Sequence, residues 1–250
     1  MILKMKQLHS VEEGLNMGIE YEYYNGDGKT ASFYAKNKPI VLPMTFEGKY
    51  KGENEYNVIL EKTVCPEGWK EGMLGYQYKK ENGTKIGISK YDYNYYNSNN
   101  ELIGYLKYIS VSPKKKFFEA PKAYNYQEFT FKGQKYDMYD VRLRGKGMFY
   151  CIYKDSDLVA MIERELPKIN WLDNYTIYSL DEIDVEFLYL ATAYYDYVNF
   201  EEVSLQANRQ GEFQVESGVS HIEYRKDILD KYDPEFKNKI IIMEVSKEEK

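Results

Sequence analysis

The segment after residue 179 most constrains the fold, because it is a helical run with almost no polar side. Ser179-Leu180-Asp181-Glu182 has the spacing of a helix capping box, and the acidic residues up to Glu186 suit the positive end of a helix dipole. The run from Phe187 to Tyr195 is then apolar all round, as is typical of a buried helix. A helix over 180–198 would be about 28 Å long. Such a helix needs protein on every side.

The chain before this helix reads as short strands separated by turns. Turn signals include Asn25-Gly26, Asn82-Gly83, Lys132-Gly133 and the stretch 155–157, and Asn-Gly is the strongest hairpin signal. The 28 tyrosines favour sheet. Aromatic and β-branched runs occupy residues 19–24, 56–60, 73–78, 86–91, 102–109, 129–131, 148–153, 158–162 and 175–178. The sequence therefore predicts a mainly β fold, an antiparallel closed β-barrel around a buried near-C-terminal helix at about 180–198, with short terminal extensions.

Domain organisation follows from the change of character after the helix. We expect one barrel domain over residues 1–200 and an acidic C-terminal extension over 201–250, packed on the barrel or partly flexible. In the extension we expect a helix from Lys226 to Tyr232, stopped by Asp233-Pro234, and a late strand over 240–243. A short helix from Ser10 to Leu15 is expected near the start.

Charge and cysteine usage indicate the class of protein. The net charge is -6, but residues 101–150 carry +5 and residues 151–200 carry -7, counting the lysines and arginines against the aspartates and glutamates. The acidic total disfavours nucleic-acid binding. No run is long enough to span a membrane and no signal peptide is visible, so we expect a cytoplasmic protein. Cys65 and Cys151 are expected to be buried free thiols.

Three segments at the end of the barrel region carry a family resemblance. They are the run from Asp157 to Arg164, the strand Asp173-Asn-Tyr-Thr-Ile-Tyr, and the run from Asp184 to Tyr195 that leads into Tyr195-Asp-Tyr. This series resembles the closing section of the tubby C-terminal-like superfamily, which includes LURP-one-related proteins and phospholipid scramblases. The resemblance covers residues 101–200, and 19–100 by strand count. It implies a closed barrel around a central helix.

The chain also departs from that family. It runs some fifty residues past the helix and has neither a calcium-binding run nor a palmitoylated cysteine cluster. A scramblase activity is therefore not expected.

Motifs for catalysis or metal binding are absent from the sequence. The only histidines are His9 and His221, too few for a zinc site, and no nucleophile, metalloprotease or phosphate-loop motif occurs. We expect no metal and no cofactor. Glu163 and Glu165 have the spacing of an acid–base pair on one strand face, although alternate acidic positions on an exposed strand explain them as well.

Two basic stretches suggest a binding surface. Lys114, Lys115 and Lys116 precede Phe117 and Phe118, a pattern that suits an anionic membrane surface. The alternative is that the phenylalanines begin a strand whose edge the lysines protect.

Arg142, Arg144 and Lys146 occupy alternate positions, so one strand face would present all three to phosphate groups. Tyr91, Tyr93 and Tyr95 also share a strand face, which suits either a partner surface or packing on the helix.

The leading hypothesis is a noncatalytic cytoplasmic binding module for anionic lipid headgroups or a small ligand. The alternative is a protein–protein interaction or structural protein that uses tyrosine-rich strand surfaces, and a hydrolase is the third hypothesis.

Overall fold

The structure is a computed structural model, and it describes residues 1–8, 18–36, 47–73, 75–114, 123–143, 147–165, 173–210 and 226–248. The short helix expected at 10–15 lies outside these residues, as do both histidines. The described strands are β1 (Ile2–Leu8), β2 (Gly18–Asn25), β3 (Gly28–Lys36), β4 (Glu47–Lys51), β5 (Glu55–Lys62), β6 (Lys70–Glu71), β7 (Gly75–Lys79), β8 (Lys85–Ser89), β9 (Tyr91–Asn97), β10 (Leu102–Ser112), β11 (Tyr124–Phe131), β12 (Gln134–Leu143), β13 (Gly147–Lys154), β14 (Asp157–Arg164) and β15 (Asn174–Ser179). The helices are α1 (Val185–Gln210), α2 (Lys226–Leu229) and α3 (Pro234–Glu248).

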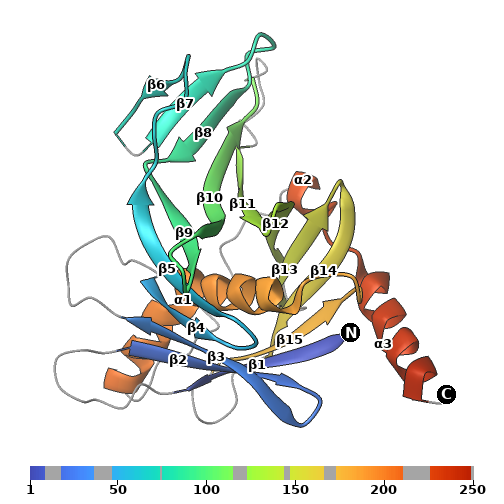
Figure 1. Ribbon diagram of the computed structural model, residues 1–250. Helices are drawn as coiled ribbons and strands as arrows, with labels where there is room; N and C mark the ends of the chain where they lie inside the picture. The colour runs from blue at the N-terminus through green and yellow to red at the C-terminus, as the bar shows by residue number, and fades with distance from the viewer. Residues whose placement is uncertain are drawn as a thin grey trace.

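The strands form a closed antiparallel barrel, as the sequence predicts. Twelve strands close the ring in the order β1-β2-β3-β4-β5-β9-β10-β11-β12-β13-β14-β15, with β15 paired back to β1. The first half of β10 pairs with β9, whereas its second half pairs with β8. The three strands β6, β7 and β8 therefore leave the barrel as a projecting sheet, called the flap here (residues 63–90) (Figure 1).

Tight turns at the predicted positions set the register of the hairpins. In the turn between β11 and β12, Lys132 and Gly133 both have positive φ, at 47° and 76°. The turn between β13 and β14 repeats this pattern at Asp155 and Ser156. Two successive positive φ values define the turn whose twist matches that of antiparallel strands.

Residues 185–197 of helix α1 lie inside the barrel (Figure 1). The start of the helix differs from the prediction, because the capping residue is Asp184 and not Ser179. Asp184 Oδ1 accepts hydrogen bonds from the backbone N–H groups of Glu186 (2.9 Å) and Phe187 (3.2 Å). The helix begins at Val185 and continues to Gln210, beyond the end expected at 198 and the domain boundary expected at 200.

Helix α3 packs on the outer surface of the barrel, and it corrects the strand expected over 240–243. Phe236 and Ile240, one helical turn apart, are buried against the strands, while Ile242 is 65% exposed. Pro234 begins this helix, with Asp233 as its cap at 2.9 Å from the N–H of Glu235. Tertiary packing has overridden the strand propensity of the isoleucines.

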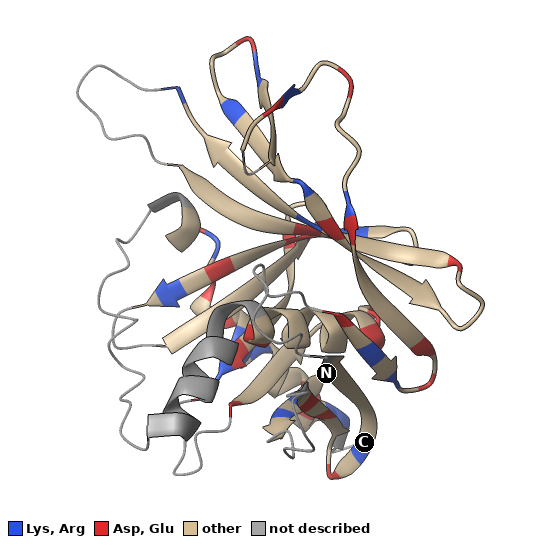
Figure 2. Ribbon diagram, turned by 90° about the vertical axis from the view of Figure 1, so that its left-hand side faces the viewer, with Lys and Arg blue, Asp and Glu red and all other residues tan. Residues whose placement is uncertain are grey.

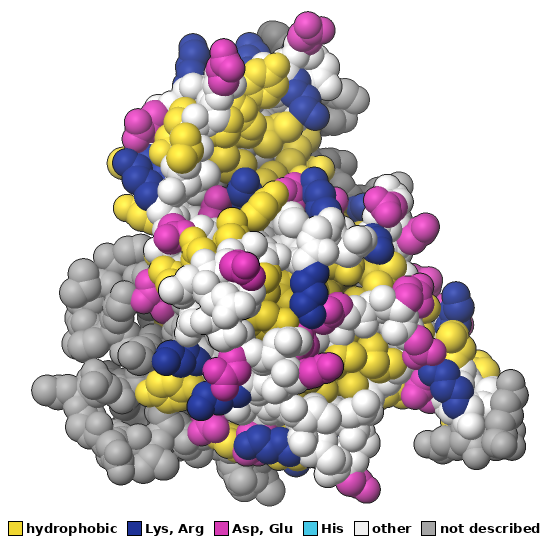
Figure 3. Space-filling view, viewed as in Figure 1, with side chains coloured by type: hydrophobic (Ala, Val, Ile, Leu, Met, Phe, Trp, Pro, Cys, Tyr) yellow, Lys and Arg dark blue, Asp and Glu magenta, His cyan; other side chains and the backbone are white. Residues whose placement is uncertain are grey.

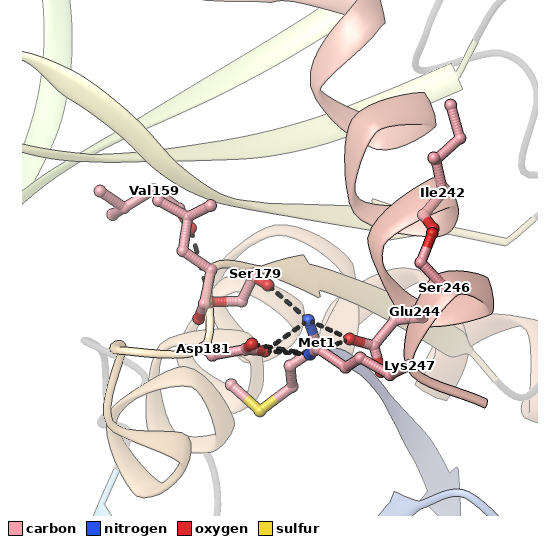
Figure 4. A network of polar contacts seen from close by, with 9 residues as sticks. Met1, Val159, Ser179, Asp181, Ile242, Glu244, Ser246 and Lys247 are labelled. Atoms are coloured by element: carbon pink, nitrogen blue, oxygen red, sulfur yellow. Dashed lines mark hydrogen bonds and ion pairs between the residues drawn. The ribbon is translucent and has the colours of Figure 1, made fainter. Parts of the chain in front are cut away.

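Charged groups join the end of α3 to the edge of the barrel (Figure 4). Lys247 Nζ lies 2.6 Å from Asp181 Oδ2, and the amino group of Met1 lies 3.1 Å from both Asp181 Oδ1 and Glu244 Oε1. Because exposed ion pairs contribute little, the burial of the apolar side of α3 is the main attachment.

Replacing a fully buried helix residue tests the central position of α1. Leu190→Asp places a carboxylate in the barrel interior, where Leu190 is 0% exposed. An unpaired buried charge costs several kcal/mol, against a total stability of about 5–15 kcal/mol. We expect soluble folded protein to be largely lost, as measured by yield and thermal unfolding. Ile242→Asp, on the exposed side of α3, is the matched control and should fold. A Leu190→Asp protein with an unchanged melting temperature would contradict the enclosed position.

Candidate functional site

Aromatic side chains from α1 and the surrounding strands fill the interior of the barrel. Phe187 stacks on Tyr136 with ring centroids 3.9 Å apart, and Tyr189 stacks on Tyr23 at 4.3 Å. Such stacked pairs add to the stabilisation from burial. The interior thus serves as the hydrophobic core.

The tyrosines of β9 belong largely to this core. Tyr93 contacts the ring of Tyr194 on α1 at 5.6 Å, and Tyr95 is fully buried against Phe129 at 4.6 Å. Tyr91 remains 47% exposed. Of the two interpretations of this strand, packing on the helix is therefore confirmed for Tyr93, and burial in the core for Tyr95.

A polar cluster ties α1 to the barrel around Asp196. Its carboxylate accepts hydrogen bonds from the hydroxyls of Tyr175 (2.5 Å) and Tyr21 (2.7 Å) and from Gln7 Nε2 (3.3 Å). Burial, with the negative charge of nearby Asp173, raises the pKa of Asp196 to about 7, and the tyrosine hydrogen bonds oppose this shift. These donors satisfy a carboxyl group that is 0% exposed.

A buried ion pair completes this cluster. Arg164 donates to Asp173 Oδ1 from Nε at 2.9 Å and from Nη2 at 2.6 Å, and Gln7 Oε1 accepts from the N–H of Asp173. The sequence segments that carry the resemblance thus meet in space, since Arg164, Asp173, Tyr175 and Asp196 come from all three. They hold α1 against β1, β2 and the hairpin of β14 and β15.

The N-terminal end of α1 has a second polar anchor. Glu186 accepts hydrogen bonds from the N–H and side-chain amide of Asn54, both at 2.9 Å, from Tyr56 at 2.6 Å and from Lys132 at 3.0 Å. Despite its burial, these bonds hold the pKa of Glu186 below its usual value. Lys132 also contacts Asp184 at 2.9 Å. The hairpins β4–β5 and β11–β12 are thereby fixed to the helix.

The candidate acid–base pair is engaged by neighbouring side chains. Glu163 forms an ion pair with Lys237 of α3, and Glu165 accepts a hydrogen bond from Thr176 at 3.0 Å. The Glu163–Lys237 pair helps to hold α3 on the barrel, and the Glu165–Thr176 bond links the residue after β14 to β15. They give the two carboxylates structural partners.

The cysteines differ in environment. Cys151 is buried, which raises the pKa of its thiol and makes it a poor nucleophile, as expected. Cys65 is exposed, contrary to the prediction, because it lies in the loop before β6 and outside any strand.

The flap has two unlike faces, because neighbouring residues of a strand point to opposite sides. Tyr76 pairs across the sheet with Ile88, and Tyr78 with Ile86, so one face is apolar. The other face carries small and polar residues, which are Gly75, Gln77, Lys79, Lys85, Gly87 and Ser89. Figure 3 shows hydrophobic side chains gathered over the flap, with both basic and acidic side chains around their margin.

Exposed apolar side chains follow the outer edge of the flap, formed by β6 and its flanking loops. Val64 is 86% exposed and Met73 is 88% exposed. Trp69 stands beside the half-exposed Tyr78, with ring centroids 5.7 Å apart. The sequence analysis assigns Met73 to a strand over 73–78, whereas β7 begins at Gly75 and leaves Met73 outside it. Val64 and Trp69 belong to no predicted site, because a single apolar residue in a loop carries no pattern.

Only part of the predicted basic surface can be placed. Lys114 is exposed, and its side chain lies beside Gly83 in the turn between β7 and β8. Arg142 Nη2 lies 2.6 Å from Asp140 Oδ2, so its guanidinium is neutralised within the fold. The residues Lys115, Lys116, Phe117, Phe118, Arg144 and Lys146 lie outside the described residues.

The described residues offer neither a metal-binding cluster nor a membrane-spanning helix. In the described part of the chain, no three or more His, Cys, Asp and Glu side chains are arranged to hold a metal ion. None of the described helices combines the length and apolar character needed to cross a membrane.

The pH dependence of stability tests the environment of Asp196. Its pKa is about 7 in the fold against 3.8 for an ordinary aspartate, so the folded state retains a proton that the unfolded state releases. The stability that this bound proton contributes to the folded state is fully present below pH 3.8 and is lost as the pH rises through about 7.

As the pH rises across this range, we expect the free energy of unfolding of the wild-type protein to fall relative to that of Asp196→Asn, by up to about 1.4 kcal/mol per pH unit. Urea unfolding from pH 4.5 to 8 measures the difference. Asp157→Asn, at an exposed turn, is the matched control. Parallel profiles for wild type and Asp196→Asn would contradict the assignment.

Comparison with protein families, curated proteins and solved structures finds no match to this chain. The tubby-like resemblance therefore stays a prediction.

Proposed function

We propose that this protein is a noncatalytic binding module that attaches to anionic phospholipid surfaces through its flap. The observation that carries the proposal is a group of exposed lysines beside exposed apolar side chains on a projecting sheet. Six lysines of the flap and its borders are exposed, namely Lys62, Lys70, Lys79, Lys80, Lys85 and Lys114. Among the described flap residues, only Lys90 forms an ion pair, with Glu71 at 2.8 Å.

The charge balance of this region is opposite to that of the whole chain. The flap contains five lysines and three glutamates, and Lys62 and Lys114 border it, while the net charge of the chain is -6. Basic positions are spread along the flap strands, and acidic positions lie at some of its turns (Figure 2). Each lysine near an anionic membrane contributes about 1 kcal/mol.

Three of the ten acidic residues in the stretch 151–200 are removed from the surface. Asp173, Glu186 and Asp196 are buried in the barrel, and each is hydrogen-bonded to cationic or polar partners there. These three carboxyl groups interact mainly with their hydrogen-bond partners inside the barrel. The flap projects away from that core (Figure 1).

A lipid surface suits the flap better than a protein partner does. Interfaces between proteins are depleted in lysine, whereas membrane-binding surfaces combine lysine with aromatic and aliphatic anchors. The cytoplasmic leaflet is the anionic one, which agrees with the cytoplasmic location that the sequence predicts.

Removing flap lysines tests the proposal. The triple variant Lys79→Ala, Lys80→Ala, Lys114→Ala loses up to about 3 kcal/mol of attraction, so its partition onto phosphatidylserine vesicles should fall by up to about a hundredfold. Binding should also weaken between low and physiological salt. Vesicle co-sedimentation measures both effects.

The matched control removes the same charge elsewhere. Lys4, Lys49 and Lys51 are exposed on barrel strands β1 and β4, and their triple alanine variant should bind nearly as wild type does. Equal recovery with neutral and anionic vesicles, or no recovery with either, removes the lipid proposal and leaves a protein partner in its place.

A further inference from the structure

We infer that the outer edge of the flap enters the acyl-chain boundary of the membrane, so that attachment depends on apolar insertion as well as on charge. This inference rests on the proposed function and specifies how deep the contact goes. Its basis is the exposure of Val64 and Met73, which lie before and after β6 in the sequence and are 86% and 88% exposed. Side chains this exposed contribute almost nothing to the core.

The composition of the edge suits an interface between water and hydrocarbon. Trp69 and Tyr78 form an aromatic pair on the apolar face of the flap, and such rings favour the headgroup level of a bilayer. Lys62 and Lys70 border the same edge and can extend their ammonium groups toward lipid phosphates. Aliphatic tips, aromatic rings and cations thus occur together on one edge.

The geometry also indicates why this edge and not the rest of the flap inserts. Tyr76, on the same face but on β7, which lies between β6 and β8, is 3% exposed, and its hydroxyl donates to the carbonyl of Thr63 at 3.0 Å. That bond ties the loop before β6 to the sheet, so the loop is held in place. Insertion of a fixed loop loses little conformational entropy.

Trp69 provides a direct probe of insertion. The chain has two tryptophans, so Trp171→Phe leaves Trp69 as the sole emitter. With phosphatidylcholine–phosphatidylserine vesicles, we expect a blue shift of its emission and quenching by lipids brominated near the top of the acyl chain. Co-sedimentation of the same samples measures binding independently. If Trp171→Phe does not fold, the difference between wild type and Trp69→Phe reports the same signal.

Apolar variants test the edge without changing its charge. The double variant Val64→Ser, Met73→Ser should weaken binding to anionic vesicles by at least about tenfold, because two apolar side chains no longer leave water. The matched control Leu102→Ser, Ile242→Ser removes apolar residues that are 54% and 65% exposed elsewhere, and should bind as wild type does.

The outcomes separate this inference from the proposal on which it rests. Binding without quenching, together with unchanged binding of the Val64→Ser, Met73→Ser variant, would overturn insertion and leave charge-driven attachment intact. Absence of binding to anionic vesicles would overturn both. A blue shift that appears without lipid as protein concentration rises would show that a second copy covers this edge, and would also overturn insertion.

Discussion

The enclosure of α1 is the constraint on which the rest of the structure depends. A helix with apolar side chains all round must be covered on every side, and a closed ring of strands does this while leaving no sheet edge unpaired. Enclosure then creates a second requirement, because polar groups on the enclosed part of the helix become buried. Glu186 and Asp196 meet it with partners from different strands. The anchors therefore fix both the position and the rotation of the helix within the ring.

Much of the fold could be predicted from local patterns. The apolar run from Phe187 to Tyr195 predicted the enclosed helix, and turn pairs such as Lys132-Gly133 predicted hairpins that the structure contains. These signals are read within a few neighbouring residues. The prediction of a strand over 240–243 was wrong, because it used only local propensity. The isoleucines have strand propensity, but packing against the barrel places them in helix α3.

The candidate site was harder to predict because it depends on long-range pairing. Strands β9 and β8 pair with successive parts of β10, and this pairing separates the flap from the barrel. It depends on the register between segments that are distant in the sequence. Lys114 was selected from a lysine run, but only the fold places it beside Gly83 in another hairpin. The exposure of Val64 and Met73 could not be predicted from the sequence, since it follows from the position of β6 at the edge of the sheet.

The distribution of charge explains how a protein with net charge -6 can present a cationic surface. Carboxylates such as Asp196 and Glu186 are committed to the interior, where hydrogen bonds from tyrosines, Asn54 and Lys132 balance them and the barrel wall separates them from the flap. Apart from Lys90, which pairs with Glu71, the described flap lysines are exposed and form no ion pair, so their field is screened mainly by salt. Net charge describes the whole molecule at long range. Within a Debye length of a membrane, about 8 Å at physiological salt, the nearest lysines dominate the attraction.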